Sequence, residues 1–225
     1  MRQTVRPGGA SMSKKELIKR YAFFVFGLFV NSLGISLITK SDMGTSPISS
    51  IPYTLSIGLP LSLGMFTLIF SLLLIVIQLI IMRKNFPKQY WLQIPVSLIF
   101  SYFIDLTMSM LDFLDPDTYL LQAVSLVAGC IVLGTGVFME TAANVVMLPG
   151  ECTVKAITTV SKIDFGKSKI AMDVTMSVIA AVIGIIMYHK LAGVREGTFI
   201  SALAVGFIAR LLNKSIGKKI QTIFS

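Results

Sequence analysis

Two acids interrupt an otherwise apolar part of the chain, GVFMETAANVVMLPGECTVKAI, which covers residues 136–157. Glu140 and Glu151 lie on either side of Asn144, and a Leu-Pro-Gly break at residues 148–150 comes just before Glu151. Burial of a carboxyl group raises its pKa by desolvation, so a buried carboxyl group is suited to bind a proton or a cation. A plainer interpretation is that Glu140 marks the edge of a membrane and Glu151 stabilises the positive end of a helix. The elements that carry these residues decide between the two interpretations.

The composition of the chain is that of an integral membrane protein. Of its 225 residues, 54% are hydrophobic and only 14% are charged, and the mean hydropathy is +0.80. A soluble domain of this size needs more polar side chains to cover its surface. Apolar runs of roughly 20 residues predict helices that cross the bilayer, whereas a membrane β-barrel would show alternating segments of about 10 residues. We therefore predict an all-α membrane protein with six transmembrane helices, at residues 21–39, 62–82, 90–111, 119–139, 170–188 and 198–212.

The net charge of +9 is explained by the distribution of basic residues between the loops. Of the 20 Lys and Arg residues, 17 lie on the side of the two termini, and the other 3 are Lys40, Lys190 and Arg195. By the positive-inside rule, both termini are cytoplasmic. We expect a multi-pass protein of a bacterial cytoplasmic membrane, in contact with the lipid bilayer and with no nucleic acid as a partner.

The chain offers few residues for metal binding or catalysis. Cys130 and Cys152 have neither a CxxC spacing nor a nearby His, and the single His, His189, adjoins Lys190. This pattern predicts two inert thiols, no metal site and no Ser/His/Asp catalysis. The chain also lacks a Walker A sequence, although a separate ATPase subunit stays open as an option. We expect neither enzyme activity nor a cofactor.

The chain repeats its own plan. An offset of 106 pairs Gly44 with Gly150 and Ser62 with Ser168. Each half holds three spans, an odd number, so the second half enters the membrane from the opposite side. We predict two inverted three-helix repeats, residues 12–116 and 117–225, within one membrane domain; residues 1–11 are set aside as a tag remnant or an upstream start. Inverted repeats are a common structural basis for alternating access.

A connector with a short helix of its own is predicted in each half. Residues 41–61 and 141–169 are rich in Ile, Leu, Val, Thr, Ser and Ala, unlike ordinary solvated loops. Ser46 before Pro47 is typical of a helix N-cap followed by proline, and Glu151 fits the first turn of a helix. Such helices either lie on the membrane surface or are broken and re-entrant, in which case protein or a water-filled cavity must surround them. We favour the broken or re-entrant form because both halves carry it.

Two motifs resemble those of a bacterial family. The runs GISLITKSDMGTSPIS, residues 34–49, and GVREGTFISALAVG, residues 193–206, are similar to the YczE/YyaS/YitT-type bacterial integral membrane proteins. The resemblance covers about residues 17–216, and the chain lacks the soluble C-terminal domain of many YitT-type members, which favours the YczE-like branch. The resemblance implies a six-helix protein of the cytoplasmic membrane that is generally suspected to be a transporter, with no particular substrate.

Charged residues inside a span are costly, so each one needs a partner, water or a function. Asp105 lies in the third predicted span, and an offset of 105 pairs it with Arg210, which we interpret as a basic residue that reaches the cytoplasmic boundary. Asp173, near the start of the fifth span, either pairs with a basic neighbour or takes part in coupling.

We expect a secondary transporter or exporter of a small polar solute, anionic solutes included, that works by alternating access, with proton coupling as an option. The alternative is a non-transporting accessory or scaffold protein for another membrane system. A transporter would face its acids and connectors toward an internal cavity, whereas a scaffold would have a dry, packed centre. Expected partners are a small-molecule substrate and a second copy or another membrane protein. The predicted substrate-binding residues are Asn31, Thr45, Ser46, Glu140, Asn144 and Glu151, and the coupling candidates are Asp105 and Asp173.

Overall fold

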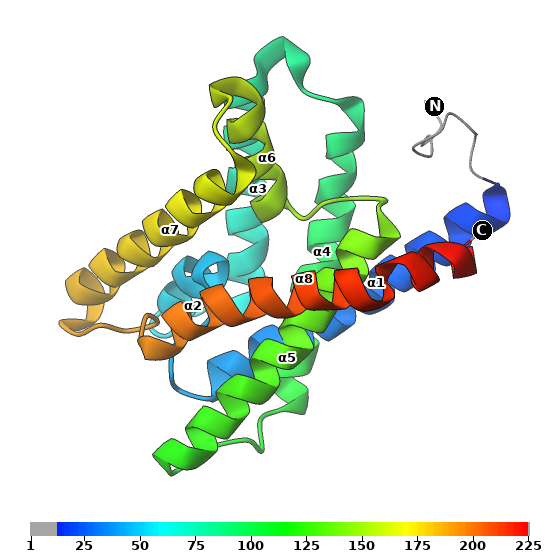
Figure 1. Cartoon of the computed structure of the whole chain (residues 1–225). Coiled ribbons are helices and arrows are strands. Elements are labelled where there is room, and N and C mark those ends of the chain that lie inside the picture. Colours follow the sequence, from blue (N-terminus) through cyan, green and yellow to red (C-terminus); the bar gives the residue numbers. More distant parts are fainter. Residues whose placement is uncertain (1–12, 225) are drawn as a thin grey trace.

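The computed structural model describes residues 13–224, which form helices joined by turns and short extended segments (Figure 1). The α-helices are α1 (Lys14–Lys40), α2 (Ser50–Ser56), α3 (Leu63–Met82), α4 (Gln93–Met110), α5 (Tyr119–Ala143), α6 (Pro149–Ser161), α7 (Phe165–Tyr188) and α8 (Glu196–Phe224). Short 3₁₀ turns are η1 (Pro47–Ser49), η2 (Arg83–Asn85) and η3 (Lys88–Leu92). The predicted tag or upstream start at residues 1–11 lies outside the described residues.

Six of the described helices are long and apolar enough to cross a membrane, which confirms the number of predicted spans. Four of them extend several residues beyond the predicted ends, and α1 and α8 extend furthest. α1 begins at Lys14, and the buried salt bridge between Glu16 and Arg20 lies within its first two turns. α8 continues past residue 212 to Phe224, whose ring packs edge-on against Phe23 with the centroids 5.3 Å apart. Both extensions are too polar for hydropathy alone to include them.

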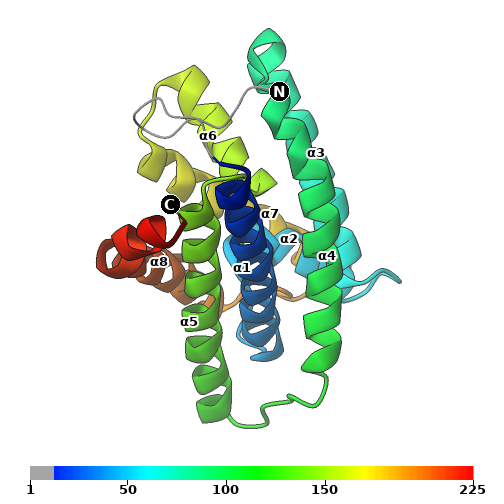
Figure 2. The ribbon, with the colours of Figure 1, turned by 90° about the vertical axis from the view of Figure 1, so that its right-hand side faces the viewer.

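The centre of the protein is the antiparallel pair of α1 and α5 (Figure 2). Glycines allow their backbones to approach closely. A Cβ atom on Gly34 would lie 2.4 Å from the backbone nitrogen of Leu133, and one on Gly136 would lie 2.5 Å from that of Asn31. Small residues have this role at many interfaces between membrane helices. These glycines therefore allow α1 and α5 to pack closely along the interface.

The remaining helices are arranged around the central pair. α4 packs against α1 and α3, and α8 crosses the outer side of α5 (Figures 1 and 2). The short helix α2 packs against α3 and α7, and α6 also packs against α3 and α7. Both connectors therefore lie between the same two long helices, one from each half of the chain.

Polar contacts tie the elements together at both ends of the bundle. At one end, Lys40 at the end of α1 forms a salt bridge with Asp112 in the loop after α4, with Nζ and Oδ1 2.9 Å apart. At the other end, the Lys19 ammonium group donates to the carbonyl oxygen of Ile223 at 3.1 Å, which joins the start of α1 to the end of α8. The described ends of the chain thus lie on the same side, as an even number of spans requires.

Candidate functional site

The two connectors meet inside the protein where their short helices begin. Pro47 occupies the first position of η1, as predicted, and Pro149 occupies the first position of α6. A Cβ atom on Gly150 would lie 1.8 Å from Cδ1 of Ile48, so the glycine makes room for this contact. The positive ends of two short helices therefore converge in the interior.

The buried residues of the connectors also indicate that both connectors enter the interior of the protein. Thr45, Ser50 and Thr54 of the first connector are fully buried. In α6 residues 149–154 are buried or partly buried, whereas the last three residues, 159–161, are all exposed. A helix that lies on a membrane surface would expose one face along its whole length. The observed distribution favours connectors that enter the protein.

Glu140 and Asn31 form a buried pair between α5 and α1. The Asn31 side-chain amide donates a hydrogen bond to Oε1 of Glu140 at 2.7 Å, and the two residues are 4% and 5% exposed, respectively. A Cβ atom on Gly27 would lie 3.5 Å from Cγ of Glu140, so this glycine borders the acid. One amide donor is less than the two carboxylate oxygens can accept. The pair is therefore chemically suited to take up a proton, a cation or a further hydrogen-bond donor.

Glu151 lies in the first turn of α6, close enough to Glu140 for their carboxylates to repel each other. Desolvation by burial raises the pKa of Glu151, and the Lys169 ammonium group partly opposes this shift. Lys169 also forms a salt bridge with Asp173, one turn further along α7. Asp173 thus pairs with a basic neighbour, which is the plainer of its two interpretations. Together these groups make a line of charges from α5 through α6 to α7.

A second group of buried polar residues joins the two motifs that lie far apart in the sequence. The hydroxyl oxygens of Thr45 and Thr39 are 3.0 Å apart, and the backbone N–H of Thr45 donates to Oγ1 of Thr198. The backbone N–H of Gly197 donates to the carbonyl oxygen of Met43 at 2.8 Å. The MGTSP run after the first span and the REGT run before the last span are therefore in direct contact.

Ser46 and Asn144 lie at the ends of helices. Ser46 precedes η1 as its N-cap, and its hydroxyl group donates to Oγ of Ser49 at 3.0 Å. Asn144 ends α5 in a left-handed conformation, with φ 51° and ψ 45°, and its side chain is exposed. The structure gives Asn144 a role in helix termination, and the described contacts do not join it to Glu140 or Glu151. Its part in substrate binding stays a prediction.

Asp105 caps the start of α3. Its Oδ1 accepts a hydrogen bond from the backbone N–H of Gly64 at 2.8 Å, and its Oδ2 accepts one from the hydroxyl group of Ser62 at 2.7 Å. The first N–H groups of a helix lack partners within the helix, so a carboxylate in this position stabilises it. This structural role accounts for an acid in the third span, and coupling by Asp105 stays a prediction.

A buried amide cluster, which the sequence analysis did not single out, holds the start of α6. Gln78 of α3 and Gln93 of α4 exchange hydrogen bonds at 3.0 and 3.2 Å. The Gln78 amide also donates to the carbonyl oxygen of Pro149 and to Oγ1 of Thr153, both at 3.1 Å. The signal for this cluster was the single amide in the apolar run LLLIVIQLII, residues 72–81, because a polar side chain in a span needs a partner.

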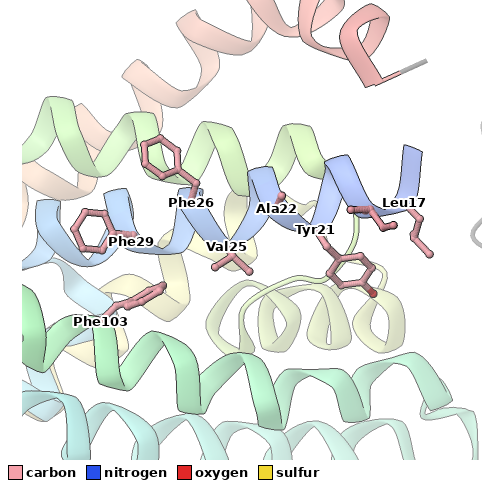
Figure 3. Close-up of a pocket in the computed structure, with 8 residues that line it drawn as sticks. Leu17, Tyr21, Ala22, Val25, Phe26, Phe29 and Phe103 are labelled. Atoms are coloured by element: carbon pink, nitrogen blue, oxygen red, sulfur yellow. The ribbon is translucent and has the colours of Figure 1, made fainter. Parts of the chain in front are cut away.

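An open groove between α1 and α4 has a volume of about 760 Å³ (Figure 3). Its lining residues are Leu17, Ile18, Tyr21, Ala22, Val25, Phe26, Phe29 and Phe103. These side chains are almost entirely apolar, and none of the predicted site residues is among them. The groove is therefore distinct from the polar region around Glu140 and does not suit a small polar solute.

Comparison with known proteins places the chain in a family without giving an activity. Residues 18–214 match a family described as "Family of unknown function (DUF6198)". The chain belongs to this family. It is also similar to the protein named "Uncharacterized protein YyaS" from Bacillus subtilis (strain 168), with 33% identity over 66 residues, which are 29% of this chain and 33% of that protein. The chain thus spans about a third of the length of this curated relative. No solved structure matches the chain.

Proposed function

We propose that this protein is a secondary transporter or exporter of a small polar solute that works by alternating access. The observation that carries the proposal is the convergence of the two connector helices in the interior, near the buried pair of Asn31 and Glu140. In many secondary transporters, broken helices at the interface of two repeats form the solute site. Irregular backbone at membrane depth is tolerated where protein surrounds it, and the full burial of Thr45, Ser50 and Thr54 supports such a place for the first connector.

The arrangement of the helices supports two inverted three-helix repeats. Each half contains a long helix, a connector whose short helix begins at proline, and two more long helices. The contacts between the halves are reciprocal, because α2 packs against α7 and α6 packs against α3. A reciprocal pattern of this kind is expected when two repeats are related by a pseudo-two-fold axis.

The charges around Glu140 favour a solute with a cationic or hydrogen-bond-donating group. Glu140 and Glu151 both contribute carboxyl oxygens, whereas Lys169 is already paired with Asp173. An anion would have to approach two carboxyl groups, which is unfavourable unless both are protonated. We therefore propose that a proton or a positively charged group binds between the two acids, and we favour this over an anionic solute.

Binding of the solute is expected to raise the unfolding temperature of the purified protein, and Glu140→Gln is expected to weaken binding at least about tenfold. Glutamine keeps the size of the side chain and an oxygen for Asn31, but it removes the negative charge. A thermal-shift screen against a broad set of metabolites, followed by titration of each hit, measures this effect. Glu151→Gln is tested in the same way.

The matched control is Glu196→Gln, because Glu196 is an exposed acid at the start of α8. It is expected to leave the ligand response unchanged. Full ligand response in both Glu140→Gln and Glu151→Gln would show that the site assignment is wrong. A screen in which no metabolite stabilises the protein would favour the accessory or scaffold function.

The proposed orientation places both termini in the cytoplasm of a bacterial cell. Single cysteines at Asp115 and Lys88, in a chain whose Cys130 and Cys152 are replaced by alanine, report on opposite sides of the membrane. With a membrane-impermeant thiol reagent on intact cells, we expect labelling at position 115 and none at position 88. The opposite labelling pattern would reverse the orientation.

A further inference from the structure

α3 and α4 are joined by a polar seam along one face of α4. Gln93 and Gln78 exchange hydrogen bonds at one end of the seam. The Ser101 hydroxyl group donates to the carbonyl oxygen of Gly64 at 2.6 Å, and Asp105 accepts from the N–H of Gly64 at the other end. The α4 residues are separated by multiples of four, so they lie on one face of the helix.

The second half carries counterparts of these positions but does not form the seam. An offset of 105 pairs the three α4 residues with Thr198, Gly206 and Arg210 of α8. An offset of 106 pairs Gly64 with Ile170 of α7. Gly206 faces open space, and Ile170 is 66% exposed. α7 and α8 diverge from the loop that joins them, and α8 has no packing on α7 comparable to that of α4 on α3 (Figure 1).

Two polar groups of the second half, Ser168 and Arg210, have no partner among the described residues. The Ser168 hydroxyl group is buried without a hydrogen-bond partner, although its counterpart Ser62 is bonded to Asp105. Arg210 is exposed, and no described residue forms a hydrogen bond or a salt bridge with it. Asp164 caps α7 through Oδ1, which accepts from the N–H of Gly166 at 2.9 Å. The charges are therefore reversed between the two halves. In the first half the acid, Asp105, lies on α4 and caps α3, whereas in the second half the acid, Asp164, lies at the start of α7 and the basic residue, Arg210, lies on α8.

The two halves also differ in where open space lies beside α4 and its counterpart α8. In the second half α8 packs on α5, and a Cβ atom on Gly134 would lie 2.8 Å from Cβ of Ile208. The counterpart of Ile208 is Phe103, which lines the groove of about 760 Å³ between α4 and α1 (Figure 3). α4 therefore packs on α3 and on part of α1, where the hydroxyl groups of Ser36 and Thr107 are hydrogen-bonded, but it leaves open space beside residues 17–29 of α1. α8 packs on α5 and leaves space toward α7.

We propose that α4 and α8 exchange these two positions between the states of the protein. In the second state α8 closes on α7 through Gly206, with Arg210 near Asp164, while α4 leaves α3 and fills the groove along α1. A small residue at position 206 permits the close approach, and a guanidinium group suits a carboxylate as a partner. The inference rests on the proposed alternating-access function and names the helices that carry it out.

Cross-linking of the pair Ile170→Cys and Gly206→Cys tests the closed seam between α7 and α8. The protein is reconstituted in liposomes with Cys130 and Cys152 replaced by alanine, and a short bifunctional thiosulfonate reagent is added. An engineered protease site in residues 189–195 shows whether a link joins the two helices of one chain. We expect such a link. The control pair Ile170→Cys and Phe199→Cys should not link, since position 199 lies about 10 Å further along α8.

A second readout follows the opening of α3 and α4. Ser97 is 1% exposed, its hydroxyl group has no partner, and it lies on the seam face of α4. Ser97→Cys should react with N-ethylmaleimide at least about tenfold faster after positions 170 and 206 are linked, because opening exposes it. An unchanged rate, no link, or a link only between two copies would each overturn the exchange. None of these readouts needs a solute, so their failure is distinguishable from the failure of the ligand screen.

Discussion

Replacing Arg20 with alanine is expected to lower the free energy of unfolding by about 3–5 kcal/mol, the cost of removing one partner from a buried ion pair. Arg20 is 4% exposed, and its Nε and Nη2 atoms both donate to Oε1 of Glu16 at 3.1 Å. Nη1 donates to the carbonyl oxygen of Ala143 at the end of α5, and Nη2 to Oε1 of Gln221 in α8. One guanidinium group therefore ties three helices together.

Unfolding in mixed micelles of increasing denaturing detergent, followed by circular dichroism, measures this change. Lys218→Ala is the matched control, because Lys218 is an exposed basic residue on α8 and its loss should change stability by less than about 0.5 kcal/mol. Arg20→Lys keeps the charge but loses the planar fork, so it should recover only part of the stability. If Arg20→Ala and the wild type unfold at the same fraction of denaturing detergent, the contacts of Arg20 contribute no net stability.

Arg20 also shows what hydropathy leaves out. The six spans follow from runs of apolar residues whose length matches the bilayer, and the structure has six helices of that kind. Arg20 stands at the edge of the first run, so hydropathy alone places it in a cytoplasmic loop and predicts that the helix begins one residue later. The spacing of Glu16 and Arg20 was a signal for a longer helix, since residues four apart on a helix are neighbours. Only the packing of α5 and α8 around the pair explains its burial.

The types of residue in the candidate site were predictable from the sequence, but the pairing of these residues with one another was not. A Glu and an Asn in apolar helices predict a polar interior, yet Asn31 and Glu140 are 109 positions apart, and no local pattern pairs them. The proline-led starts of the connectors were predictable because proline is favoured in the first turn of a helix. The contact between Ile48 and Gly150 was not, because it depends on how the two halves pack.

The internal repeat also predicts only part of what the structure shows. It predicts which residues are counterparts, but it assumes that the two halves have the same packing. In the structure the counterparts differ: Ser101 of α4 is bonded to α3, whereas Gly206 of α8 faces open space. Sequence identity between repeats carries no information on which half is closed, because the difference is one of conformation.

Gly34→Ala is expected to be the most disruptive small change in the interior, with a loss of about 1–3 kcal/mol or more from overpacking. The added Cβ atom would lie 2.4 Å from the backbone nitrogen of Leu133 and 2.5 Å from its Cα atom. Backbone atoms cannot rotate away as a side chain does, so α1 and α5 must separate. Separation would also stretch the 2.7 Å hydrogen bond between Asn31 and Glu140, one turn along the same interface.

Gly206→Ala is the matched control for this substitution. Both glycines lie inside long helices, so alanine brings each helix the same gain in intrinsic propensity, about 1 kcal/mol. An added Cβ atom at position 206 meets nothing within 4 Å, so this variant should be at least as stable as the wild type. The difference between the two variants in detergent unfolding isolates the packing of α1 on α5. Equal stability of the two variants would show that α1 and α5 separate at little cost in free energy. A pair of helices that separates so readily could not hold Glu140 at a fixed distance from the Asn31 amide.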